Sequence, residues 1–146
     1  MNYLRHIGIT VTDLDVSLAF YRDMLGFQVY KEMQEQGEYI DKFSQLSGVN
    51  VKTVKMKEMH DGCIELLKYD SHPKPNDLNK KNQVINIGCS HVAFTIQDLD
   101  ALCEKLKENG IFFHCSPTKT PDGYAKVAFC RDPDGTIIEL VELLGE

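Results

Sequence analysis

The fold is decided by a stretch that occurs twice, His6-Ile7-Gly8-Ile9-Thr10-Val11-Thr12-Asp13-Leu14-Asp15 and His91-Val92-Ala93-Phe94-Thr95-Ile96-Gln97-Asp98-Leu99-Asp100. The two copies align without a gap at a constant offset of 85 positions, from 6 to 91. The His, Thr, Leu and both Asp positions are identical. An internal repeat of this kind indicates a fold built from two copies of one supersecondary unit. We therefore expect the two halves of the chain to share one order of strands and helices.

Apolar residues alternate with small or polar ones at the start of each copy. Ile7, Ile9 and Val11 would face a core while the residues between them face away, which is the pattern of a β-strand with one buried face. An aspartate then follows, Asp13 in the first copy and Asp98 in the second, where it can cap a helix. The repeat therefore predicts a strand and then a helix in each half.

A second parallel lies at the end of each half, where an Asp-Gly turn precedes an apolar strand that carries one carboxylate, Glu65 or Glu139. Gly26 and Gly110 stand where a helix would end. Further segments with the composition of strands are 27–32, 49–56, 112–115 and 125–130. We predict an α+β fold in which a βαβββ module occurs twice.

The predicted modules cover 1–70 and 87–146, with a polar, proline-containing linker over 71–86. A short helix over 39–46 is expected in the first module only. A chain of 146 residues with 42% hydrophobic residues is long enough for such an arrangement.

Charge and composition exclude several classes of function. The formal net charge of −6 and the lack of a long basic stretch argue against nucleic acid as a partner. The apolar runs are too short to span a membrane, and the N-terminus lacks the pattern of a secretion signal. We expect a cytoplasmic protein whose five cysteines are reduced, mostly buried and not catalytic.

Glu65 and Glu139 are costly residues for an apolar strand. Desolvating an isolated charge costs several kcal/mol, so such a carboxylate is expected to be paired, protonated or bound to metal. His6 and His91 hold equivalent positions in the two copies, and a pseudo-twofold axis between the modules would bring all four side chains together. Imidazole and carboxylate together suit Ni²⁺, Zn²⁺, Co²⁺, Mn²⁺ or Fe²⁺. We therefore predict one divalent metal ion held by these four side chains.

Each predicted ligand has an ordinary alternative when it is taken alone. A histidine in a strand is more often a satisfied core or surface residue, and Glu65 could lie exposed on a sheet edge. Recurrence at equivalent positions favours the metal site. The other histidines do not recur at equivalent positions of the two halves. We interpret them as surface or loop residues: His60, His72 and His114.

The segments 6–27, 64–66, 90–94 and 129–140, in this order and spacing, resemble the glyoxalase, bleomycin-resistance and extradiol-dioxygenase superfamily, the vicinal oxygen chelate superfamily. The resemblance covers nearly the whole chain. It implies that the paired modules form a cupped mixed sheet around the metal, and that the chain is a homodimer. The metal site would lie within one chain or be shared between two, and both arrangements stay open.

A complete His-Glu-His-Glu set is similar to that of glyoxalase I, or lactoylglutathione lyase, and of methylmalonyl-CoA epimerases. The resemblance implies a lyase or isomerase that transfers a proton through a metal-stabilised enediolate of a small α-hydroxycarbonyl or hemithioacetal substrate. Glu139 or Glu65 would be the catalytic base. A CoA-ester epimerase and a non-catalytic small-molecule-binding module are the alternatives.

The chain departs from both specialised patterns. Thr10 and Tyr69 stand where glyoxalase I has the arginine and the asparagine that hold glutathione. Leu46-Ser47 stand where the epimerases have a catalytic carboxylate, although Glu35 and Glu38 are close in sequence. The substrate is therefore left open by the sequence.

Overall fold

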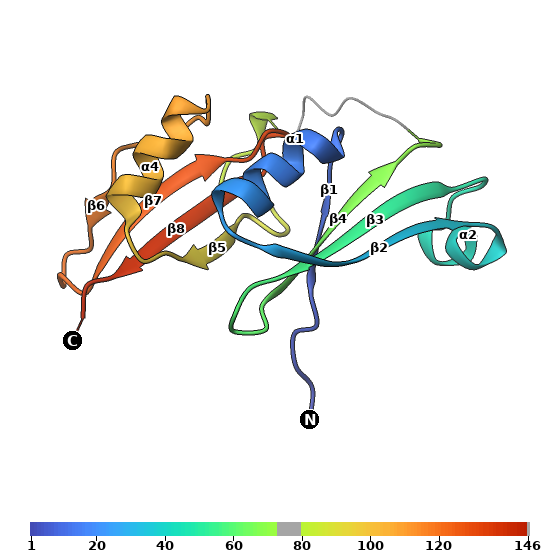
Figure 1. Ribbon diagram of the computed structural model, residues 1–146, viewed down its shortest axis with the longest axis horizontal. Coiled ribbons are helices and arrows are strands. Elements are labelled where there is room, and N and C mark those ends of the chain that lie inside the picture. Colours follow the sequence, from blue (N-terminus) through green and yellow to red (C-terminus); the bar gives the residue numbers. More distant parts are fainter. Residues whose placement is uncertain (73–79, 146) are drawn as a thin grey trace. The chain divides into compact units, whose positions relative to one another are not determined.

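The computed structural model describes residues 1–72 and 80–145. It divides into two compact units, Met1–Pro75 and Asn76–Glu146, and each contains one four-stranded sheet (Figure 1). Part of the predicted linker, 73–79, lies outside the described residues. Two mixed sheets with few helices confirm the predicted α+β fold with a repeated βαβββ order.

The first unit begins with strand β1 (Ile7–Thr10), helix α1 (Leu14–Leu18) and a π-helical segment, η1 (Ala19–Met24). The chain continues through β2 (Gln28–Gln36), α2 (Glu38–Ser44), β3 (Asn50–Lys57) and β4 (Cys63–Tyr69). The sheet has the order β1-β4-β3-β2, in which β1 and β4 are parallel and the other neighbours are antiparallel. The short helix expected over 39–46 is confirmed as α2, one residue earlier at its start and two at its end.

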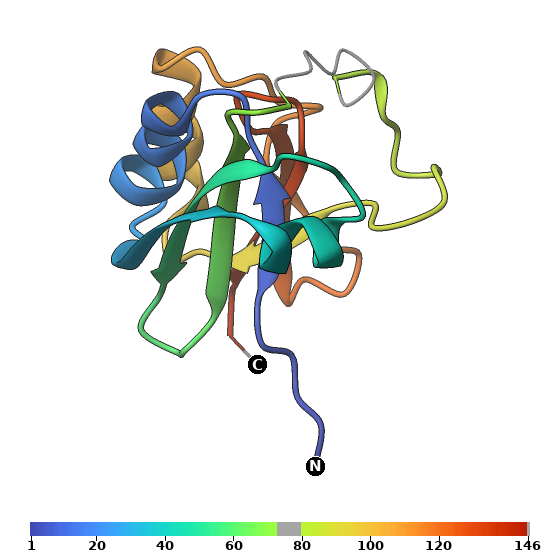
Figure 2. The ribbon, with the colours of Figure 1, turned by 90° about the vertical axis from the view of Figure 1, so that its right-hand side faces the viewer.

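The two faces of this sheet have different roles. One face carries the apolar core, with Ile9, Leu66 and Val54 buried side by side in the strand register. Leu18 and Tyr21 of α1 and η1 are buried as well. Burying an aliphatic side chain stabilises the fold by about 1.5–3 kcal/mol relative to leaving it exposed. Figure 2 shows α1 and α2 on different sides of the strands, so α2 belongs to the second face.

The predicted helix caps are confirmed in both units. The Asp13 carboxylate accepts a hydrogen bond of 3.1 Å from the Val16 amide, and the Asp98 carboxylate accepts one of 3.1 Å from the Ala101 amide. Gly26 follows η1 with a φ of 88°, a backbone conformation that glycine adopts without steric cost. The caps fix where the chain turns from strand into helix, immediately after β1 in the first unit.

The helix predicted after the first strand is not a regular α-helix throughout. Its second part is π-helical, because the Leu25 amide donates to the Phe20 carbonyl five residues earlier at 3.0 Å. A π-helical turn takes in one more residue than an α-helical turn. Phe20 and Tyr21 are both buried in this segment, and their rings meet edge to face at 4.8 Å between centroids.

The second unit repeats the order with β5 (Val92–Thr95), α4 (Leu99–Glu108), β6 (Thr118–Lys119), β7 (Ala125–Arg131) and β8 (Ile137–Leu143). Its sheet has the order β5-β8-β7-β6, again with one parallel pair, β5 and β8. The strand predicted over 112–115 is wrong. That segment forms only an isolated bridge between Phe113 and Cys130, and the edge strand begins after Pro117, which has no amide hydrogen to donate to a neighbour.

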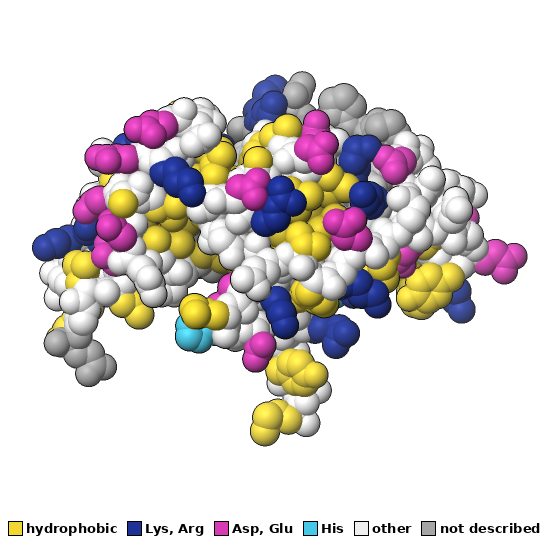
Figure 3. Space-filling view, viewed as in Figure 1, with side chains coloured by type: hydrophobic (Ala, Val, Ile, Leu, Met, Phe, Trp, Pro, Cys, Tyr) yellow, Lys and Arg dark blue, Asp and Glu magenta, His cyan; other side chains and the backbone are white. Residues whose placement is uncertain are grey.

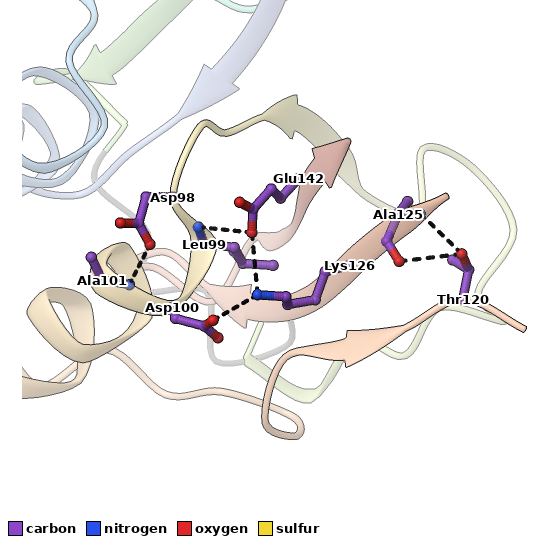
Figure 4. A network of polar contacts seen from close by, with 8 residues as sticks. All are labelled: Asp98, Leu99, Asp100, Ala101, Thr120, Ala125, Lys126 and Glu142. Atoms are coloured by element: carbon purple, nitrogen blue, oxygen red, sulfur yellow. Dashed lines mark hydrogen bonds and ion pairs between the residues drawn. The ribbon is translucent and has the colours of Figure 1, made fainter. Parts of the chain in front are cut away.

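A polar network joins α4 to its sheet (Figure 4). The Lys126 ammonium lies 2.6 Å from the Asp100 carboxylate and 3.3 Å from that of Glu142. Glu142 also accepts a hydrogen bond of 3.3 Å from the Leu99 amide at the start of the helix. The hydrogen bond to Asp100 raises the pKa of Lys126, which therefore stays charged. The network holds α4 against the sheet, where its own Leu99 and Leu106 side chains are buried.

The surface carries both signs of charge. On the face drawn in Figure 3, Lys and Arg side chains are interspersed with Asp and Glu, and apolar side chains show between them. Among the described residues, no helix is long and apolar enough to cross a membrane.

Candidate metal centre

The first predicted pair of ligands is brought together in the first unit. His6 directly precedes β1, and Glu65 lies on β4 opposite Gly8, its partner in the parallel register. The His6 Nε2 atom lies 2.8 Å from the Glu65 Oε2 atom. Glu65 is only 9% exposed, although it is a carboxylate in an otherwise apolar strand.

The second pair repeats this arrangement in the second unit. His91 directly precedes β5, and Glu139 lies on β8 opposite Ala93. The His91 Nε2 atom lies 3.0 Å from the Glu139 Oε2 atom. The ring of Phe129 packs edge to face against the His91 ring, with 5.4 Å between centroids.

The donor atoms of the two pairs fit a divalent metal ion. Each pair places one imidazole nitrogen and one carboxylate oxygen within hydrogen-bonding distance of each other, as neighbouring ligands of one metal ion would be. This mixture suits borderline transition metals better than calcium or magnesium, which prefer oxygen ligands only. Within 1–72 and 80–145, no group of three or more His, Cys, Asp or Glu side chains is gathered as for a metal ion. Each unit thus brings together two of the four predicted ligands.

Ser90 orients one of these imidazoles, a role that the sequence analysis missed. Its hydroxyl oxygen lies 2.7 Å from His91 Nδ1. When Nε2 serves as a ligand, Nδ1 carries the ring proton and the Ser90 hydroxyl accepts it. Partners of this kind fix the ring and its tautomer. The only signal in the sequence is a serine directly before the histidine, and Arg5 stands in the equivalent place before His6.

Replacing Ser90 by alanine is expected to weaken metal binding by about 10–100-fold, the usual effect of removing such a partner. Isothermal titration of metal-free protein with Zn²⁺ would measure the change. Ser71→Ala is a matched control, because the Ser71 hydroxyl makes the same 2.7 Å contact with the neighbouring His72, outside both ligand pairs. Equal Zn²⁺ affinity in Ser90→Ala and Ser71→Ala would exclude the orienting role.

Glu65 also lines a cavity of about 390 Å³ in the first unit. The cavity lies on the face of the sheet opposite the apolar core, between β2, β3, β4 and α2. Its lining residues are Met33, Glu35, Tyr39, Ile40, Phe43, Val51, Thr53, Lys55, Glu65 and Leu67. The volume falls within the range of small-molecule sites, so this ligand pair is next to space for a substrate.

Helix α2 is attached to the sheet at this cavity by Asp41. Its carboxylate accepts hydrogen bonds from the amides of Gly48, at 2.9 Å, and Val49, at 2.8 Å. The bonds from Val49 and Gly48 lower the pKa of Asp41, so the carboxylate that receives them is charged at neutral pH. The helix has no buried residue of its own, and this tether therefore has a large part in its position.

The other histidines lie outside the two pairs. His60 and His114 are exposed, as expected, and His72 is half-buried. His114 nevertheless stacks on Phe129 at 6.2 Å, and Phe129 in turn contacts His91. Burial and the nearby Arg131 lower the pKa of His114, so its ring is neutral at pH 7.

The cysteines are all free, but the expectation that they are mostly buried is wrong. Cys103 and Cys130 are buried, whereas Cys89 and Cys115 are exposed because both lie in loops next to β5 and β6. Burial raises the pKa of Cys130 to about 12, so that thiol is not ionised at neutral pH. A thiol must ionise to act as a nucleophile, and Cys130 is therefore inert.

Comparison with known proteins finds a family match and several relatives. Residues 3–140 match the model of the family described as the Glyoxalase/Bleomycin resistance protein/Dioxygenase superfamily. A "Probable lactoylglutathione lyase" of Synechocystis sp. is 31% identical over 96% of this chain and 95% of its own length. The uncharacterized protein YwkD of Bacillus subtilis is 34% identical over 95% of each chain.

Solved structures share the fold. A glyoxalase family protein from Bacillus cereus superposes with a TM-score of 0.90 and 22% identity, covering 99% of this chain and 96% of that one. The trypanothione-dependent glyoxalase I of Leishmania major superposes with a TM-score of 0.65 and 23% identity, covering 97% of this chain and 87% of that one. At these identities the likeness concerns the fold alone.

Proposed function

Because the chain belongs to the glyoxalase/bleomycin resistance protein/dioxygenase superfamily, we propose that it is a divalent-metal-dependent lyase or isomerase of the glyoxalase I-like type. The substrate would be a small α-hydroxycarbonyl compound or a hemithioacetal. The observation that supports this most directly is the paired His and Glu donors, at 2.8 Å and 3.0 Å, at equivalent positions of both units. Relatives named as lactoylglutathione lyases suggest an enzyme of the same kind.

His6, Glu65, His91 and Glu139 would hold the metal ion, with the two units of one chain or of two chains each giving a half-site. A divalent ion held there would act as a Lewis acid on two adjacent substrate oxygens. Ser90 would keep the His91 ring in its binding orientation. A dimer that shares the sites would take His6 and Glu65 from one subunit and His91 and Glu139 from the other.

Proton transfer would be the work of a carboxylate from the ligand set. Glu139 or Glu65 would accept a proton from the substrate carbon at one carboxylate oxygen and return it to the neighbouring carbon. The low exposure of Glu65 keeps water from competing for that proton. Glu65 also borders the cavity, where the substrate carbon would lie.

A CoA-ester epimerase is the second candidate, because the cavity contains a carboxylate outside the ligand set. Glu35, at the end of β2, lines the same cavity as Glu65 and lies 3.4 Å from the hydroxyl of the buried Thr53. Epimerisation removes a proton from one face of a carbon and returns one to the other face. Glu35 and a ligand carboxylate could serve as the two proton carriers.

Glutamine substitutions separate these functions. In metal-loaded protein, Glu65→Gln and Glu139→Gln are expected to lower kcat by at least about 100-fold for whichever carboxylate is the base, the usual contribution of a general base. Glu35→Gln should leave hemithioacetal isomerisation within about twofold of the wild type, since Glu35 is not a ligand. Turnover of hemithioacetals and of acyl-CoA esters would be followed for each variant.

Loss of acyl-CoA epimerisation in Glu35→Gln, together with no reaction of hemithioacetals in the wild type, would favour the epimerase. A wild-type protein that binds metal but turns over neither class would contradict both enzymes and favour the non-catalytic binding module.

A further inference from the structure

A row of side chains crosses the cavity face of the first sheet at the level of Glu65. The register places Gly8 of β1 and Lys55 of β3 on either side of Glu65, and Lys31 of β2 opposite Lys55. Lys57 is two residues further along β3, and side chains two apart share a face. Three lysines thus occupy one end of this face, next to a predicted metal ligand.

Lys57 lies over the Tyr30 ring, 5.8 Å from its centroid, but stability does not explain the pairing of Lys31 with Lys55. Like charges directly opposite each other in an antiparallel pair are destabilising, and Lys31 and Lys55 are such a pair. Among the described residues, the ion pairs of lysine involve Lys52, Lys68 and Lys126 instead. In a chain with a net charge of −6, three lysines beside a single carboxylate, Glu65, are an unusual local feature.

The second unit shows that the fold does not require a cation here. In the first unit Lys55 lies opposite Glu65, and in the second unit the residue opposite Glu139 is Phe129. The two halves share the ligands, the strand order and the register, yet this position differs in charge and in size. The lysine at this position is therefore specific to the first unit.

The far end of the cavity is aromatic. Tyr39 and Phe43 of α2 remain 67% and 69% exposed, and their rings meet at 5.0 Å between centroids. Apolar Met33, Val51 and Leu67 line the floor between these rings and Lys55. Lys55 and Val51 are four positions apart on β3, a distance of about 13 Å at the usual rise of a strand.

We propose that this cavity binds an organic anion with an uncharged apolar or aromatic tail. Its carboxylate or phosphate lies against Lys55, with Lys31 adding positive charge, and its tail lies on Met33, Tyr39 and Phe43. This inference rests on the proposed function and names its substrate class, a small hydroxycarbonyl compound with one anionic group. Glu35, at the aromatic end, disfavours a second negative charge there.

Two fluorescent probes test the site in metal-free protein, and both emit more strongly in an apolar environment. Anilinonaphthalene sulfonate has an aromatic body and one negative charge, whereas N-phenylnaphthylamine has a similar body and no charge. Lys55→Met is expected to weaken sulfonate binding about tenfold, since a charge-assisted contact is lost, and to leave the neutral probe within about twofold. Phe43→Ser should weaken both probes. Lys55→Arg should restore sulfonate binding, because the charge is kept.

Lys52→Met is the matched control. Lys52 lies on the same strand but faces the other side of the sheet, where it pairs with Glu32 at 3.8 Å. Its replacement should leave the binding of both probes unchanged. Equal sulfonate binding by the wild type, Lys55→Met and Lys52→Met would overturn the proposal. Binding of both probes by Phe43→Ser as tightly as by the wild type would overturn it as well. Circular dichroism would establish that each variant is folded. Because no metal is present, these results do not depend on the metal centre, whose failure would appear separately as a lack of metal binding.

Discussion

The double variant His6→Ala, His91→Ala is expected to bind Zn²⁺, Ni²⁺ or Co²⁺ more than about a thousandfold more weakly than the wild type. The substitutions remove one imidazole from each half-site and leave two carboxylates, which bind borderline metals poorly without nitrogen ligands. Removal of an outer partner alone typically costs 10–100-fold, so the loss of two direct ligands must cost more. Elemental analysis after gentle purification and titration of the metal-free protein would measure the difference.

The histidines outside the pairs provide the control. His60→Ala, His72→Ala removes the same number of imidazoles without touching His6, His91 or their glutamates, and should bind about one metal ion per chain like the wild type. Retention of native affinity in the His6, His91 variant would refute the site. Equal weakening in both double variants would mean that the ions bind to surface histidines in general.

A mixture of His6→Ala chains and His91→Ala chains distinguishes metal sites shared between two subunits from sites built within single chains. If the sites are shared, a heterodimer joins the intact half-site of one variant to the intact half-site of the other. It then has one complete site and one that lacks both histidines. Random exchange would restore roughly one quarter of all sites, because half of the dimers are mixed and each of these has one good site of two.

The complementation experiment needs an exchange step, such as mild denaturation and joint refolding, and a mixture without exchange as control. Sites built within single chains would stay defective after exchange, and no tight binding would return. Sedimentation should show a dimer at micromolar concentration for the wild type. A monomer with full metal binding would contradict both the dimer and the shared site.

The sequence predicted the parts of the fold that rest on local chemistry and on the repeat. Alternation of Ile7, Ile9 and Val11 predicts β1 because a strand with one buried face has a period of two. Asp13 and Asp98 predict where the helices begin, because their carboxylates satisfy amides that have no partner within a helix. The repeat itself predicts that both halves share one topology.

Other features depend on packing or on long-range pairing and could not be predicted. The π-helical turn of η1 buries Phe20 and Tyr21 together, which a repeating pattern of leucines does not reveal. The segment 112–115 has the composition of a strand but forms only one bridge. Edge pairing depends on the neighbouring chain as well as on local propensity.

Some residues of the candidate site could be predicted from the sequence, and others could not. The pairs His6 with Glu65 and His91 with Glu139 follow from the repeat, since identical positions in equivalent strands must have equivalent neighbours. Ser90 and Lys55 have no counterpart of the same type in the other half. The repeat therefore could not identify them. Their roles emerge only from the hydrogen bond to His91 and from the register opposite Glu65.

The connection between β2 and β3 can change the lining of the cavity without moving the predicted metal ligand Glu65. Helix α2 is inserted there without disturbing the pairing of β3 with β4, so it adds Tyr39 and Phe43 to the cavity while Glu65 stays in register. The corresponding connection in the second unit, between β6 and β7, is a tight turn in which the Gly123 amide donates to the Thr120 carbonyl. An insertion or deletion of one residue inside β4 would move the Glu65 side chain to the core face of the sheet. One in the connection between β2 and β3 would change only the residues that line the cavity. A change in this one surface loop would therefore alter which molecules the cavity accepts and leave the predicted metal ligands in place.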